Sequence, residues 1–186
     1  MIYWIEPIPV DSGYYILLVL ILALARGADL LSTWIASPNL ALEGNPIVRW
    51  LGWRLGMLAN VMLCLVVARY PLISVAAATM SILVAARNFK TAWMMRAMGE
   101  ERYLAFSLNQ MLLTDRRLYY FCLFAECFLF GIIGLAVACY SEVPSTPLAV
   151  GVGIVLYAVA VGFYSCLSLW RSLRGLKKKD DLSESR

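Results

Sequence analysis

Histidine is absent from the 186-residue sequence, and its absence removes several kinds of chemistry. Zinc sites of the His-Glu type, haem held by histidine, Ser–His and Cys–His nucleophile pairs and histidine proton relays all need an imidazole. The five cysteines lie in apolar runs without a C-x-x-C pair, so we interpret them as buried small hydrophobic residues rather than as disulfides or metal ligands. We therefore expect neither a metal nor a cofactor.

Charge is scarce as well. Only 15% of the residues are charged, 62% are hydrophobic and the mean hydropathy is +0.75, which leaves too little polar surface for a soluble domain of this size. We predict an integral membrane protein of the all-α class, because about 20 apolar residues cross a bilayer as a helix. The expected bundle is a single domain over residues 1–170, with spans at 14–36, 46–69, 72–88, 118–140 and 148–170.

Lysine and arginine are unevenly distributed between the loops. The segment 89–117 and the tail 171–186 are basic, whereas the N-terminus and the turn 141–147 carry acids. Because basic loops stay in the cytoplasm, we expect a multi-pass protein of the cell membrane with its N-terminus outside and its C-terminus inside. The N-terminus has no basic region of the signal-peptide type, so we expect it to be retained.

The segment 89–117 combines charge with an apolar stripe. Leu104, Leu108, Met111 and Leu112 follow helical spacing, with polar residues opposite, which is typical of a helix lying in the membrane surface; a helix that binds a partner has the same pattern. We expect the tail to be disordered. Residues proposed to contact anionic lipid are Arg49, Arg54, Arg171, Arg174, Lys177, Lys178 and Lys179.

Ionisable residues also occur inside the spans, where a charge costs a few kcal/mol and must face protein or water. Arg26 and Asp29 lie one turn apart in the first span and can form a local ion pair. We predict that polar groups of four spans share one layer, in a pocket that opens to the cytoplasm. Candidate ligand-binding residues are Arg26, Asp29, Thr33, Glu43, Asn45, Asn60, Arg87, Asn88 and Glu126. The alternative is that these groups only neutralise one another and fix helix register.

Small residues recur at helical spacing in two other spans. Gly52, Gly56 and Asn60 form one such face, and Gly151 and Gly162 belong to another. Faces of this kind let a second helix approach closely, so we expect both to be contact surfaces.

A short pattern near the N-terminus resembles a known signature. Asp29 to Thr33, followed by Glu43, Asn45 and Pro46, is similar to the D-x-x-[ST]-T … E-x-N-P pattern of small prokaryotic multi-pass membrane proteins of unknown function. The resemblance covers about the first third of the chain. It implies a prokaryotic inner-membrane protein and groups these residues as a unit, but it implies no activity.

Three function classes stay open. A binding or assembly protein would use the small-residue faces and the basic cytoplasmic side, with the bilayer, anionic lipids, a second copy or another membrane protein as partner and no nucleic acid. A small carrier or ion-conducting protein would use the intramembrane charges, and would have to be an oligomer because five spans without a repeat give no alternating access. An intramembrane enzyme acting on a lipid headgroup could use Asp29 or Glu126 as base, but no D-x-x-D or G-x-G-D motif is present. We place the binding or assembly protein first.

Overall fold

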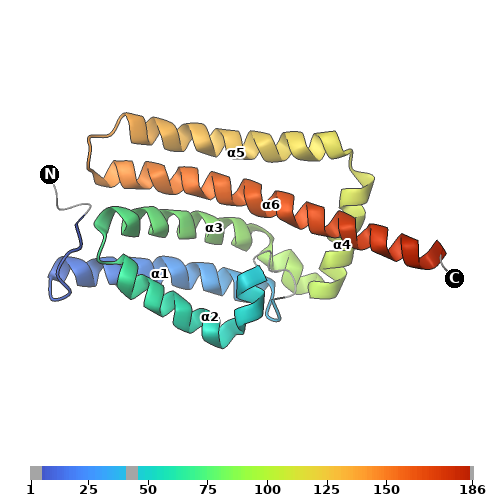
Figure 1. Ribbon diagram of the computed structural model, residues 1–186, viewed down its shortest axis with the longest axis horizontal. Coiled ribbons are helices and arrows are strands. Elements are labelled where there is room, and N and C mark those ends of the chain that lie inside the picture. Colours follow the sequence, from blue (N-terminus) through green and yellow to red (C-terminus); the bar gives the residue numbers. More distant parts are fainter. Residues whose placement is uncertain (1–5, 41–45, 185–186) are drawn as a thin grey trace.

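The computed structural model describes residues 6–40 and 46–184, and these residues form six helices (Figure 1). Five of the six are long and apolar enough to cross a membrane, so the chain is an all-α, multi-pass membrane protein, as the composition predicted. The helices are α1 (Gly13–Ala36), α2 (Pro46–Val67), α3 (Pro71–Met98), α4 (Glu100–Leu113), α5 (Arg116–Cys139) and α6 (Thr146–Glu184).

The five long helices lie side by side in the order α5, α6, α3, α1, α2 (Figure 1). The principal contacts join α1 to α3, α3 to α6 and α6 to α5, whereas α2 is attached more loosely at the edge. α1 begins at one end of the bundle and α6 finishes at the other, where α4 lies crosswise to the long helices. We call the end with α4 the α4 end, and the end where α1 begins the opposite end. Because an odd number of long helices run the length of the bundle, the beginning of α1 and the end of α6 lie at opposite ends of it.

Glycines set the tightest contacts of α6. A Cβ added at Gly153 would lie 2.6 Å from the carbonyl oxygen of Ala76 on α3, and one at Gly151 would lie 2.7 Å from the carbonyl oxygen of Gly134 on α5. Such short distances mean that backbone meets backbone without an intervening side chain. The predicted close-packing face of this span is thus confirmed at Gly151, and Gly153 adds a second contact on the side of α3.

The glycines of α2 do not behave in this way, and the predicted contact at Gly52 and Gly56 is wrong. Among the described residues, neither has an atom within 4 Å of an added Cβ. Gly52 has φ 67° and interrupts the helix with a kink, which a residue without a side chain tolerates. Farther along the chain, Cys64 of α2 and Ala68, just after its end, are buried against the α1 residues Leu18 and Leu22, so the apolar contact of α2 with α1 lies near the C-terminal end of α2.

The ends of three predicted segments also need correction. α3 continues ten residues past the expected end at Asn88 and stops at Met98, because the polar residues after it are compatible with a helix and the first interruption is Gly99, with φ 79°. The segment 89–117 is thus the end of α3 followed by α4. The expected disordered tail is helical instead, as α6 extends to Glu184; its Leu, Lys and Glu residues favour helix.

The cysteines are only partly as expected. All five are free, but only Cys64 is buried, while Cys122, Cys139 and Cys166 are exposed on the outside of the bundle. Within a membrane-spanning helix an exposed position faces lipid, where a thiol is tolerated as a small apolar group.

Candidate functional site

Arg26 is the centre of a polar cluster that joins three helices. Its Nε donates to Oδ1 of Asn60 on α2 over 2.8 Å, its Nη2 donates to the same oxygen, and its Nη1 lies 3.2 Å from Oδ2 of Asp29 and 3.3 Å from Oγ of Ser81 on α3. The amide nitrogen of Asn60 donates in turn to the carbonyl oxygen of Gly56 over 2.8 Å. We call this group of Arg26, Asp29, Asn60 and Ser81 the polar clamp.

The polar clamp is electrically balanced. Arg26 and Asp29 form the predicted i,i+3 ion pair, and their side chains keep only 28% and 18% of their exposure. A guanidinium that donates to a carboxylate, an amide and a hydroxyl on three helices tolerates burial because most of its N–H groups have an acceptor. The geometry therefore fixes the position of α2, whose apolar packing on α1 is limited to its second half.

A second, smaller polar contact lies one to two turns along α1 towards the α4 end. Nδ2 of Asn88 on α3 donates to Oγ of Ser32 over 3.3 Å and to Oγ1 of Thr33 over 3.4 Å, and Ser32 donates to the carbonyl oxygen of Asp29 over 2.8 Å. Ser32 is fully buried. These bonds connect α1 with α3 and continue the polar clamp.

Arg87 and Glu126 form a separate ion pair on another side of α3. Nη1 of Arg87 lies 3.0 Å from Oε1 of Glu126 on α5, and the side chains are 37% and 38% exposed. Arg87 and Asn88 are neighbours in sequence, so a helix directs them about 100° apart: Asn88 meets α1, and Arg87 reaches past α6 to α5. The single polar layer expected from the sequence is thus divided into two groups by α3.

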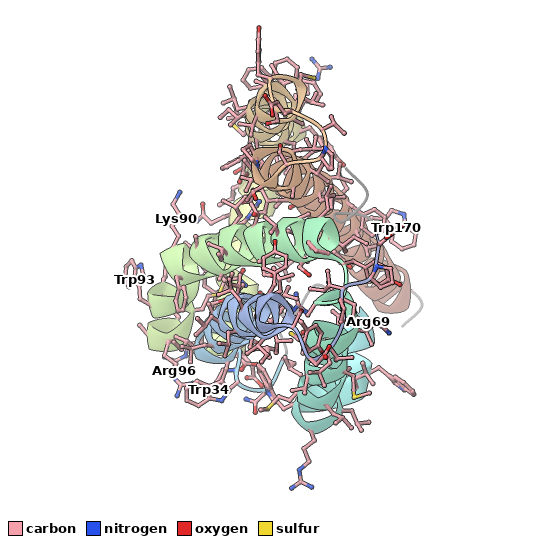
Figure 2. All side chains as sticks on the ribbon, turned by 90° about the vertical axis from the view of Figure 1, so that its left-hand side faces the viewer. Trp34, Arg69, Lys90, Trp93, Arg96 and Trp170 are labelled. Carbon is pink, nitrogen blue, oxygen red and sulfur yellow. The ribbon has the colours of Figure 1, made fainter. Side chains whose placement is uncertain are left out.

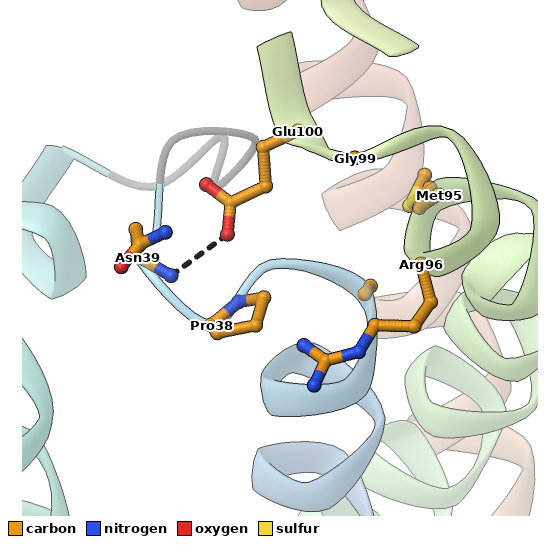
Figure 3. Close-up of a pocket in the computed structure, with 7 residues that line it drawn as sticks. Pro38, Asn39, Met95, Arg96, Gly99 and Glu100 are labelled. Atoms are coloured by element: carbon orange, nitrogen blue, oxygen red, sulfur yellow. Dashed lines mark hydrogen bonds between the residues drawn. The ribbon is translucent and has the colours of Figure 1, made fainter. Parts of the chain in front are cut away.

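A pocket lies at the α4 end of the bundle. Its volume is about 210 Å³, and it lies between the end of α1, the following loop and the junction of α3 with α4 (Figure 3). The backbone N–H of Asn39 donates to Oε1 of Glu100 over 2.8 Å, which connects the loop with α4. The lining residues are Ala36, Pro38, Asn39, Met95, Arg96, Gly99 and Glu100.

Arg96 differs from Arg26 and Arg87 because it has no counter-charge among the described residues. Its guanidinium carbon lies 5.8 Å from the centre of the Trp34 ring on α1, a cation–π arrangement. It forms no hydrogen bond or ion pair with any other residue that the structure describes. The guanidinium is thus placed by an indole, and its N–H groups have no acceptor among the described residues.

The remaining predicted site residues are either exposed or outside what the structure describes. Arg49 and Arg54 are exposed on the first part of α2. Glu43 and Asn45 lie outside the described residues, and so do the side chains of Arg171, Arg174, Lys177, Lys178 and Lys179.

Sequence reasoning missed Ser81, Asn39, Arg96 and Glu100 as site residues. Ser81 lies in a run of small residues in the third span, and the other three lie in segments where charged and polar residues are common. The spacing of Lys90, Trp93 and Arg96 could have indicated Arg96 as a site residue. Residues three apart lie on one side of a helix, and basic and tryptophan side chains on one side are typical of the membrane surface.

No group of three metal-ligating side chains occurs among residues 6–40 and 46–184. The chain matches no protein-family model, and comparison with curated proteins and with solved structures finds no similar one.

Proposed function

We propose that this integral membrane protein is a binding or assembly protein whose ligand site is the pocket at the α4 end. The observation that carries the proposal is Arg96, an arginine with no ion-pair partner among residues 6–40 and 46–184, in the wall of a pocket of about 210 Å³. A pocket of this size suits a small polar ligand or one headgroup rather than a large cofactor, because typical small-molecule sites occupy roughly 300–1,000 Å³.

The polar clamp has a different role in this proposal. Its charges neutralise one another and its donors are directed at three helices, so it serves to hold α2 in place. The ligand site is therefore assigned beyond it, towards the α4 end, where Glu100 and the N–H of Asn39 contribute polar groups to the same pocket.

The α4 end faces the cytoplasm in this proposal. Exposed basic residues gather there on several helices, among them Arg54, Lys90, Arg102 and Arg117, whereas the opposite end has Arg69 beside Glu6, Asp11 and Glu142. Basic residues next to spans are retained inside. α4 then lies in the inner membrane surface, and the basic residues of this end contact anionic lipid.

The proposal is tested by filling the pocket. Met95→Trp places an indole in the wall of the pocket. The matched control is Met57→Trp on α2, because Met57 is 57% exposed and does not line the pocket. Each protein is purified in mild detergent and its co-purifying small molecules and lipids are compared by mass spectrometry. We expect a species that is retained by the wild type and by Met57→Trp and lost from Met95→Trp. The same species in equal amount from all three proteins would contradict the assignment.

A second candidate is a small carrier acting as an oligomer, and the Arg87–Glu126 pair favours it. Both side chains keep more than a third of their exposure inside membrane-spanning helices, and intramembrane carboxylates of this kind line proton and ion pathways. In liposomes with an imposed proton gradient, this candidate predicts proton flux that Glu126→Gln abolishes. Absence of flux above that of empty liposomes would exclude it.

A further inference from the structure

Two aromatic and two basic side chains gather along one edge of the bundle. Figure 2 shows Lys90, Trp93, Arg96 and Trp34 following one another along the same side of α3 and α1. On α3 the three residues are spaced by three, so Lys90 and Arg96 lie within about 60° on either side of Trp93. We call these four residues the edge patch, and we propose that it binds the phosphodiester group of an anionic phospholipid, with Arg96 as the principal ligand.

Charge is the first argument. The guanidinium of Arg26 is neutralised by Asp29 and that of Arg87 by Glu126, whereas Arg96 and Lys90 have no ion pair with any described residue. A guanidinium can offer two parallel N–H groups to two phosphate oxygens. Trp34 contacts the guanidinium of Arg96 only through its ring, and no described residue accepts a hydrogen bond from Arg96, so its N–H groups can make this contact.

Height in the membrane is the second argument, and it distinguishes a lipid from a dissolved anion. Trp34 is two residues from the end of α1, and Trp93 and Arg96 lie in the last two turns of α3. Tryptophan prefers the headgroup level of a bilayer. An anion held by Arg96 is therefore at the height of the lipid phosphates.

The apolar surroundings provide room for the rest of the lipid. Trp93 is 69% exposed, and Leu31 and Phe89, next to the patch on α1 and α3, are 50% and 41% exposed. Exposed apolar side chains directly below a cation can contact acyl chains while the cation contacts the phosphate. The edge patch thus has both parts of a phospholipid site.

This inference rests on the proposed function and names its ligand class, because Arg96 belongs both to the edge patch and to the pocket wall. A headgroup held by Arg96 can enter the pocket next to Glu100, while the acyl chains stay on the outside of α3. The bound molecule is then a membrane lipid and not a solute from the cytoplasm.

The test compares lipid retention in nanodiscs made of phosphatidylglycerol and phosphatidylcholine. Native mass spectrometry counts each lipid bound to the wild type, Arg96→Gln, Arg96→Lys and the control Arg69→Gln, an exposed arginine at the opposite end of the bundle. We expect Arg96→Gln to lower the preference for phosphatidylglycerol about fivefold, the effect of one basic group near an anionic surface, and Arg96→Lys to lower it less. Equal effects of Arg96→Gln and Arg69→Gln would overturn the proposal.

Tryptophan fluorescence gives a second readout that does not depend on retention during purification. The contribution of Trp34 is the difference between the wild type and Trp34→Phe, and brominated phosphatidylglycerol should quench it more strongly than brominated phosphatidylcholine. Equal quenching by the two lipids would contradict the site.

The pocket variant separates the two proposals. If Arg96→Gln loses phosphatidylglycerol while Met95→Trp keeps every co-purifying species, the phospholipid site stands and the pocket assignment fails. If Met95→Trp loses a species but Arg96→Gln has no effect on lipid preference, the phospholipid site is overturned alone.

Discussion

Replacing Arg26 with leucine removes the guanidinium that connects α1 to α2 and α3, and leaves Asp29 without this counter-charge. Replacing Asp29 with leucine leaves the guanidinium with its amide and hydroxyl partners only. The double replacement removes both charges together. If the polar clamp is a self-neutralising structural element, each single change destabilises the fold strongly and the double change does so only slightly.

The magnitudes follow from the contacts. An uncompensated carboxylate in a membrane-spanning helix costs about 2.5–3.5 kcal/mol, and the lost bonds from Arg26 to Asn60 and Ser81 add about 0.6 kcal/mol each. Since Asp29 keeps 18% of its exposure and can be protonated, we expect a loss of roughly 2–4 kcal/mol for Arg26→Leu. Asp29→Leu should cost roughly 2–3 kcal/mol, and the double variant less than about 1.5 kcal/mol.

The assay is equilibrium unfolding in mixed micelles, read as a double-mutant cycle. A coupling free energy of at least about 2 kcal/mol between the two positions is expected. Arg69→Leu is the control, because Arg69 is exposed at the opposite end (Figure 2) and should change stability by no more than about 0.5 kcal/mol. Additive single effects would refute the reasoning, since independent charges and not a neutral pair would then be present.

Three further predictions concern packing and orientation. Gly153→Ala should lower the free energy of unfolding in micelles by roughly 1–3 kcal/mol, because the new Cβ would lie 2.6 Å from the backbone of α3. Gly56→Ala should be neutral or stabilising by about 1 kcal/mol, because its Cβ would meet no described atom within 4 Å. Equal losses would mean that α2 packs as tightly as α6. Reporter fusions at Ser145 and after the C-terminus should report opposite sides of the membrane, with the C-terminus cytoplasmic, and a periplasmic C-terminus would reverse the assignment of the α4 end. Spin labels at Leu108 and Asn109 of α4 should differ in accessibility to lipid and water if α4 lies in the membrane surface, and identical values would exclude that position.

The sequence alone determined the class of protein and the number of crossings. Long apolar runs leave no alternative to membrane-spanning helices, because backbone polar groups in lipid must be bonded within the segment. The first helix was predicted within one residue, since its N-cap Ser12 and its last helical residue Ala36 are both local signals. The Arg26–Asp29 pair was equally local, because one helical turn brings the two side chains together.

Only the tertiary structure decided which polar groups meet. The contact of Asn60 with Arg26 depends on the rotation of α2 about its axis. The rotation of α3 and the order of the helices decide that Arg87 meets α5 while Asn88 meets α1. The i+4 spacing of Gly52 and Gly56 did not reveal that α2 kinks at Gly52 and that neither glycine has a described atom within 4 Å of an added Cβ. Arg96 stacks on Trp34 because α1 and α3 are adjacent and end at the same height. Such contacts between helices distant in sequence follow from packing geometry, which no local periodicity specifies.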